Sequence, residues 1–172
     1  LDNLSDNMFL GAVNSFTDEP GTGKNQLSGE QIQPIPEIAR EYKAQGMQWI
    51  AIGDNNYGEG SSREHAAMSP RMLGAAAVIT RSFARIHEAN LKKQGVLPLT
   101  FEDPGDYERI RADDRLSIVG LSSLVPGVPL VCVVTHEDGE VERINLRHTM
   151  NLGQIAWFKA GSAMNYMKNT AG

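Results

Sequence analysis

One short stretch of the 172-residue sequence concentrates the side chains that could do chemistry. It is rich in glycine, begins at Gly53 and ends with the run Ser61-Ser62-Arg63. A glycine-rich turn between a strand and a helix points free backbone N–H groups at one spot, where the helix dipole adds positive potential. Such a spot binds anions, and an arginine guanidinium can hold a carboxylate through two parallel hydrogen bonds. We therefore expect these three residues to bind a small carboxylic acid.

The same residues also have a purely structural interpretation. Ser61 and Glu64 have the S-x-x-E spacing of a capping box, which predicts a helix that starts at Ser61. The sequence of this stretch does not match other known catalytic or nucleotide-binding motifs. The dinucleotide fingerprint needs a glycine where this chain has Arg63, and Gly60-Ser61-Ser62-Arg63 does not match the nucleophile elbow G-x-S-x-G.

Composition excludes several classes of function. The chain has 16 Lys and Arg against 21 Asp and Glu, a net charge of −5, which argues against binding nucleic acid. Its single cysteine, Cys132, excludes an internal disulfide and a self-sufficient cysteine-based zinc or iron–sulfur site. The four histidines are scattered without metal-ligand spacing, so no metal site is predicted. No apolar run approaches the roughly 20 residues of a membrane span.

The elements that must position these residues alternate between strand and helix, which predicts a layered α/β domain. A strand ends just before Gly53, and Gly46, Gly74 and Gly95 are expected to end helices. The expected helices cover residues 36–45, 61–73 and 82–94, and the expected strands cover 47–52, 75–80 and 96–101.

The two ends of the chain depart from this alternation of strands and helices. Residues 15–36 are rich in Gly, Pro and polar residues and are expected to form an exposed loop. After residue 101 the pattern favours strands over 115–120, 129–135 and 141–146, with Asp138-Gly139 indicating a hairpin. One closing helix is predicted from an apolar face made of Leu152, Ile155, Ala156, Ala163, Met164 and Met167.

A resemblance to a known family covers essentially the whole chain. The stretch GDNNYGEGSSREHAA, residues 53–67, resembles the signature of the C-terminal swivelling domain of the aconitase superfamily. Within that superfamily the sequence is most similar to the mitochondrial type. The match continues through SFARIHE, NLKKQG, LPLTF and DP at residues 82–88, 90–95, 97–101 and 103–104, with further similarity over 1–7 and 157–163.

The resemblance implies an α/β, layered β/β/α swivelling domain over residues 1–172, as part of a longer chain. It implies aconitate hydratase activity in the mitochondrial matrix, which interconverts citrate and isocitrate through cis-aconitate. The implied cofactor is a [4Fe–4S] cluster bound outside this chain, and the implied partners are the cluster-bearing domains and the tricarboxylic acid substrate. Carried over by position, Ser61 resembles the family's serine base, while Ser62 and Arg63 resemble residues that bind substrate carboxylates.

Physical chemistry agrees with this assignment and shows it to be incomplete. A serine hydroxyl is a weak base at neutral pH and ionises only in strongly positive surroundings. A helix N-terminus contributes at most about 2 kcal/mol, which is between one and two pKa units. A further cation is needed, and the family's arginine for this role lies just upstream of the stretch that resembles Leu1. We therefore expect the 172-residue chain by itself to be inactive.

Two other interpretations remain open at the level of sequence. The chain could be the small subunit of an isopropylmalate or homoaconitate isomerase, in which case it would co-purify with a separate cluster-bearing subunit. The segment Arg85-Ile86-His87-Glu88 favours the aconitase type instead. The chain could also be a non-catalytic binding module, which a salt-dependent affinity for nucleic acid would reveal.

Overall fold

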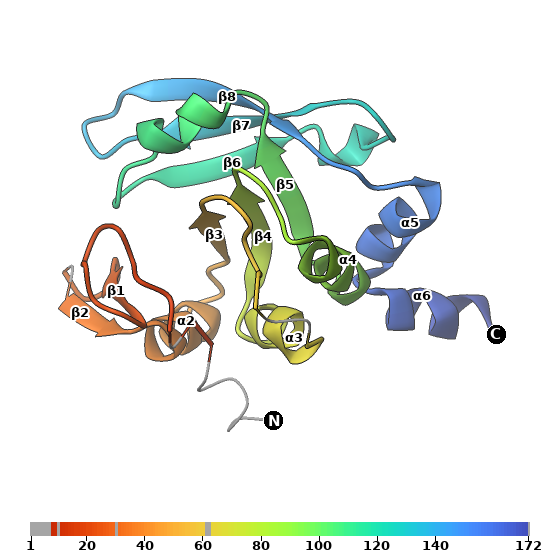
Figure 1. Ribbon diagram of the computed structural model, residues 1–172, viewed down its shortest axis with the longest axis horizontal. Helices are drawn as coiled ribbons and strands as arrows, with labels where there is room; N and C mark the ends of the chain where they lie inside the picture. The colour runs from red at the N-terminus through yellow and green to blue at the C-terminus, as the bar shows by residue number, and fades with distance from the viewer. Residues whose placement is uncertain (1–7, 10, 30, 61–62, 172) are drawn as a thin grey trace.

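A computed structural model describes residues 8–9, 11–29, 31–60 and 63–171 of the chain (Figure 1). The strands are β1 Thr22–Asn25, β2 Gln31–Pro34, β3 Trp49–Gly53, β4 Ala75–Thr80, β5 Leu97–Phe101, β6 Arg115–Val119, β7 Leu130–Thr135 and β8 Val141–Arg147. The helices are α2 Ile35–Ala44, α3 His65–Met72, α4 Arg85–Gln94, α5 Leu152–Ala160 and α6 Ala163–Thr170, with 3-10 helices η1 Pro104–Arg109 and η2 Leu121–Ser123.

One six-stranded sheet, with the order β3-β4-β5-β8-β7-β6, organises the molecule. Strands β3, β4 and β5 are parallel, because α3 and α4 return the chain to the same end of the sheet after β3 and after β4. Strands β8, β7 and β6 are antiparallel and need short connections. The two halves meet at a short antiparallel ladder between β5 and β8, where Thr100 pairs with Arg147 and Phe101 with Leu146. The predicted α/β fold is confirmed.

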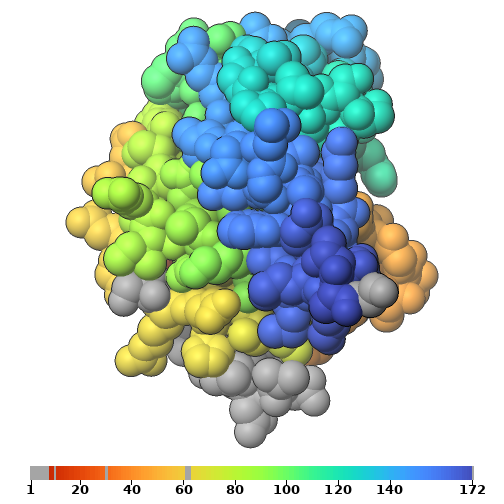
Figure 2. All heavy atoms as spheres, turned by 90° about the vertical axis from the view of Figure 1, so that its right-hand side faces the viewer, coloured from red at the N-terminus to blue at the C-terminus, as the bar shows by residue number. Residues whose placement is uncertain are grey.

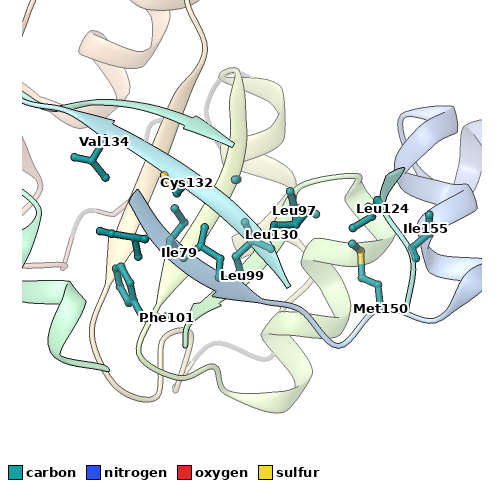
Figure 3. Close-up of a cluster of buried hydrophobic side chains, with 13 residues drawn as sticks. Ile79, Leu97, Leu99, Phe101, Leu124, Leu130, Cys132, Val134, Met150 and Ile155 are labelled. Carbon is teal, nitrogen blue, oxygen red and sulfur yellow. The ribbon is translucent and has the colours of Figure 1, made fainter. Parts of the chain in front are cut away.

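The main core fills the space between the two halves of the sheet (Figure 3). Ile79 of β4 and Leu99 of β5 lie there with Cys132 and Val134 of β7, all nearly inaccessible to solvent. Alternate residues of β7 point inward, as expected for a strand with one buried face. β4 is buried on both faces, since Val78 points the other way, against α3 and α4. Burial on both faces is typical of a central parallel strand.

The helices cover the outer face of the parallel half. In Figure 2, α5 and α6, in blue, lie beside α4, in green, with α3, in yellow, next to them. Helix α4 ends at Gly95, whose φ of 76° is the left-handed cap predicted from the sequence. Because β3, β4 and β5 are parallel, their carboxyl ends lead into loops on one edge of the sheet.

The prediction of an exposed loop over residues 15–36 is wrong. The segment contains the β1–β2 hairpin, and α2 follows directly at Ile35. Asn25 explains the difference, because it is completely buried and its amide donates to Gln33 Oε1 at 2.7 Å and to Glu41 Oε2 at 2.6 Å. These polar contacts with α2 hold a hairpin that has little apolar content.

The prediction of one closing helix is also wrong. Gly161, with φ 96°, ends α5, and the Ser162 hydroxyl starts α6 by accepting a hydrogen bond from the Asn165 N–H. The expected apolar face is divided between the two helices. Ile155 of α5 is buried, whereas Leu152 is 73% exposed and Met164 is 63% exposed.

Among the described residues, no helix combines the length and the apolar character that crossing a lipid bilayer requires.

Candidate functional site

The loop between β3 and α3 carries the residues singled out in the sequence. It is joined along its length to the segment between β4 and α4. The Arg81 N–H donates to the Gly53 carbonyl at 3.3 Å, the Tyr57 N–H donates to the Ser82 carbonyl at 3.0 Å, and the Ala84 N–H donates to the Tyr57 carbonyl at 2.9 Å. This main-chain pairing makes residues 53–57 an extension of the parallel sheet and gives the loop a defined path.

Two cross-links hold the first turn of this loop. The Ser82 hydroxyl accepts the Asn56 N–H at 2.9 Å. Arg81 donates to Asp54 Oδ1 at 3.1 Å and to Glu108 Oε1 at 3.0 Å, so it connects the loop to η1. The Arg81 guanidinium also lies 4.4 Å from the centre of the Tyr107 ring, within the range of a cation–π contact. These contacts make Arg81 a structural residue that stabilises the loop.

Tyr57 anchors the middle of the loop. Its ring lies 6.0 Å from Phe83 and 5.4 Å from His87, measured between ring centres, and burial raises the pKa of its hydroxyl above the ordinary value. Gly53 makes room for it, because a Cβ at Gly53 would lie 2.3 Å from Tyr57 Cδ2. The Tyr57 ring therefore packs directly against the backbone at the start of the loop.

Of the predicted site residues, Arg63 lies within the described part of the chain. It is exposed, and among the described residues its guanidinium has no hydrogen bond or ion pair. Arg81, by contrast, is held by two carboxylates. An exposed arginine without a protein partner, at the end of an anchored loop, is free to bind an anion. Ser61 and Ser62 lie outside the described residues.

The helix after this loop begins later than predicted. α3 starts at His65, and its N-cap is Glu64, whose side chain makes no capping hydrogen bond. The predicted helix start at Ser61 is therefore wrong. The other half of the predicted capping box, the Ser61 side chain, lies outside the described residues. The carboxylate of Glu64 accepts a hydrogen bond from Gln94 Nε2 at 3.2 Å, so it contacts the end of α4.

His87 was missed as a candidate by sequence reasoning, which found no metal-ligand spacing among the four histidines. Its side chain is buried, with 4% of the residue exposed, and it lies under the loop beside Tyr57. Burial lowers the pKa of its imidazole, so the ring is neutral at neutral pH. A histidine in an otherwise polar helix carries no periodic signal of burial, and a sequence pattern alone does not detect it.

The residues of this chain do not fit an iron–sulfur cluster. Such a cluster is held by several cysteine thiolates, and the sequence has one cysteine. Cys132 is 1% exposed in the core, and burial raises the pKa of its thiol to about 11. The described residues include no group of three or more His, Cys, Asp or Glu side chains that could hold a metal ion.

Comparisons with known proteins identify the family of the chain. Residues 1–104 match the model of the aconitase C-terminal domain. The chain is 56% identical over 170 residues to a probable mitochondrial aconitate hydratase of Dictyostelium discoideum, and 51% identical over 168 residues to the mitochondrial aconitate hydratase of Saccharomyces cerevisiae. Each alignment covers 98% of this chain and 22% of the relative, so the chain spans about a fifth of the length of these relatives.

A solved structure supports the fold. The 3-isopropylmalate dehydratase of Methanocaldococcus jannaschii superposes on this chain with a TM-score of 0.52 at 21% sequence identity. The superposition covers 79% of this chain and 74% of the other. At that level of identity the likeness concerns the architecture alone.

Proposed function

The chain belongs to the aconitase C-terminal domain family, and on that premise we propose that it is one domain of an aconitate hydratase. Residues 1–172 then form a single domain of a polypeptide about five times as long, as the coverage of the relatives suggests. The reaction proposed for the whole protein is the interconversion of citrate and isocitrate through cis-aconitate. The names of the relatives support a mitochondrial location, in the matrix.

The observation that carries this proposal is the contrast between an anchored loop and an unpaired arginine. The first part of the loop, residues 53–57, is held by Arg81, Tyr57 and main-chain pairing. Arg63 follows this loop, is exposed and has no partner among the described residues. We assign it, with Ser62, to the carboxylates of the substrate, because a guanidinium binds a carboxylate through two parallel hydrogen bonds.

Ser61 is proposed as the base that removes a proton next to a carboxylate. Its hydroxyl must be ionised, and the N-terminus of α3 stabilises an anion by about 2 kcal/mol at most. α3 begins at His65, one turn beyond the serine in sequence, which weakens even this contribution. A cation from outside this chain must therefore complete the site, and we expect the isolated 172 residues to be inactive.

The [4Fe–4S] cluster of the proposed enzyme is assigned to the part of the polypeptide outside this chain, since the residues here offer no ligand set for it. When bound there, it would act as a Lewis acid on the hydroxyl that leaves the substrate. The contribution of this chain is to bind and orient carboxylates and to take up a proton.

The test is made in the full-length polypeptide. Ser61→Ala is expected to lower kcat by about 10²–10⁴-fold, because a general base contributes that much. The KM is expected to stay within about threefold, since the carboxylate contacts remain. Arg63→Lys is expected to act in the opposite way and to raise KM more than it lowers kcat, because a lysine lacks the two-pronged contact. Ser122→Ala, an exposed serine in η2, is the control. A Ser61→Ala protein with unchanged kcat would contradict the proposal.

A separate small subunit of an isopropylmalate isomerase is the second candidate, and the fold likeness to the archaeal dehydratase favours it. Its support is weaker, because that likeness comes with 21% identity, against 51% or more for the two aconitate hydratases above. The two candidates differ in a simple observation. A single reading frame that continues upstream through cluster-type cysteines favours the domain, and a separate cluster-bearing partner favours the subunit.

A further inference from the structure

The loop before Ser61 rests directly on one side chain, the imidazole of His87 in α4. A Cβ built at Gly58 would lie 2.3 Å from His87 Cγ, 2.4 Å from its Cβ and 2.7 Å from its Cδ2. No real Cβ approaches other atoms so closely, so the backbone at Gly58 lies against the Cβ, Cγ and Cδ2 atoms of His87. The His87 ring also contacts Tyr57, at 5.4 Å between ring centres.

A comparison with Gly60 shows that this contact is specific to Gly58. Both glycines have a left-handed backbone, with φ 89° at Gly58 and 85° at Gly60. A Cβ at Gly60 would meet no described atom within 4 Å, whereas at Gly58 it would collide with the imidazole. Gly60 is therefore explained by its backbone conformation, while Gly58 is also needed for close approach to His87.

Hydrogen bonding does not explain why a histidine occupies position 87. The residue is buried, and among the described residues its Nδ1 atom has no hydrogen-bond partner. A buried polar atom without a partner is unfavourable and calls for an explanation. An aliphatic side chain would avoid this penalty, so the flat ring under Gly58 has a role other than the stability of α4.

Two contacts with α4 bracket the candidate base. Upstream of it, Gly58 lies on His87, in the first turn of the helix. Downstream of it, Glu64 accepts a hydrogen bond from Gln94, the last residue of the helix. The segment in between carries Ser61, which is three residues from the first contact and three from the second. The first contact involves the buried side chain of His87, whereas the second is exposed to solvent.

We propose that His87 is a positioning residue, which sets through Gly58 the place at which the loop presents Ser61 to the substrate. This inference rests on the proposed function of the site. It predicts that a change at His87 displaces the segment that leads from Gly58 to Ser61 more than it displaces Arg63, which lies next to the second contact. The loss is therefore expected in kcat rather than in KM.

The experiment is a double-mutant cycle in the full-length enzyme, with His87→Ala, Gly58→Ala and the pair. His87→Ala is expected to lower kcat by about 10–100-fold, as misplacement of a reacting group by about 1 Å does, with KM within about threefold. Gly58→Ala is expected to lower kcat at least as much, because its methyl group collides with the ring. In the double variant Cγ and Cδ2 of residue 87 are gone and only its Cβ remains near the new methyl group, so Gly58→Ala is expected to lower kcat by at least about threefold less than it does alone.

Two further measurements keep the cycle decisive. Lys93→Ala changes an exposed residue of the same helix and is the control for effects on α4 in general. Thermal unfolding of every variant separates a lower kcat from a smaller folded fraction. If His87→Ala does not fold, His87→Gly replaces it, because glycine removes all three of the atoms that a Cβ at Gly58 would meet.

Independent effects of the two substitutions on kcat, or a loss confined to KM, would overturn the inference. Ser61→Ala separates this failure from that of the proposed function. If Ser61→Ala abolishes turnover while the cycle shows no coupling, the positioning role alone is wrong. If Ser61→Ala leaves turnover intact, the proposed base is wrong, and the positioning role that depends on it is wrong as well.

Discussion

Replacing Gly95 by alanine is expected to separate α4 from the junction of α5 and α6. Gly95 ends α4 with φ 76°, and a Cβ there would lie 1.9 Å from the carbonyl oxygen of Gly161. That oxygen belongs to the backbone and also accepts a hydrogen bond from Arg71 of α3 at 3.1 Å. The clash cannot be relieved by turning a side chain, so two helices must move apart.

The size of the effect follows from two separate contributions. A left-handed conformation costs a residue other than glycine about 1–2 kcal/mol. Overpacking adds about 1–3 kcal/mol. Gly46 is the matched control, because it follows α2 with φ 70° and a Cβ there would meet no described atom within 4 Å. Gly46→Ala therefore measures the first contribution alone, and Gly95→Ala measures both.

The assay is urea and thermal unfolding of the 172-residue chain and its two variants. Gly95→Ala is expected to be less stable than Gly46→Ala by about 1–3 kcal/mol, which for a chain of this size corresponds to roughly 2–12 °C in Tm. Equal destabilisation by the two substitutions would refute the reasoning, because it would mean that the contact with Gly161 relaxes without a free-energy penalty.

The remaining predictions concern two charged clusters. The buried imidazole of His136 contacts Glu142 at 2.7 Å and Asp114 at 2.6 Å, and these two carboxylates raise the pKa of the imidazole above 6.5. The charged ring therefore stabilises the fold fully below about pH 6.5 and loses this effect as pH rises through the raised pKa. The free energy of unfolding should fall more steeply in the parent than in His136→Gln between about pH 6 and pH 9, and parallel curves would show that the imidazolium is not formed. Arg81→Lys keeps the charge but loses the fork that joins Asp54 to η1, so kcat of the full-length enzyme should fall several-fold while far-UV circular dichroism stays unchanged.

Local patterns were sufficient to predict most of the α/β framework. The strand over Ala75–Thr80 was predicted with the bounds that the structure has, because a short apolar run followed by polar residues has no competing interpretation. Helix ends at Gly46 and Gly95 were also predicted, since a left-handed cap depends on the residue itself. The hairpin at Asp138-Gly139 joins β7 to β8 as expected.

The errors arose where a distant contact decided between local alternatives. Asn25 and its partners in β2 and α2 stabilise a hairpin that the composition of residues 15–36 does not suggest. Gly161 divides the closing helix, because its carbonyl lies against Gly95 and Arg71. The S-x-x-E spacing predicted a cap at Ser61, whereas Glu64 contacts Gln94 in α4 and becomes the N-cap.

By itself, the sequence determined which residues are available for chemistry and their order along the loop, together with the family to which they belong. These properties depend only on residue type and spacing, which the amino-acid sequence gives directly. The tertiary structure decided which residue supports the loop, because His87 and Gly58 are 29 positions apart and meet through the packing of α4 against the sheet. It also left Arg63 without a partner among the described residues while Arg81 is fully paired. Two arginines of identical chemistry differ in their surroundings, because the fold places carboxylates beside one and exposes the other.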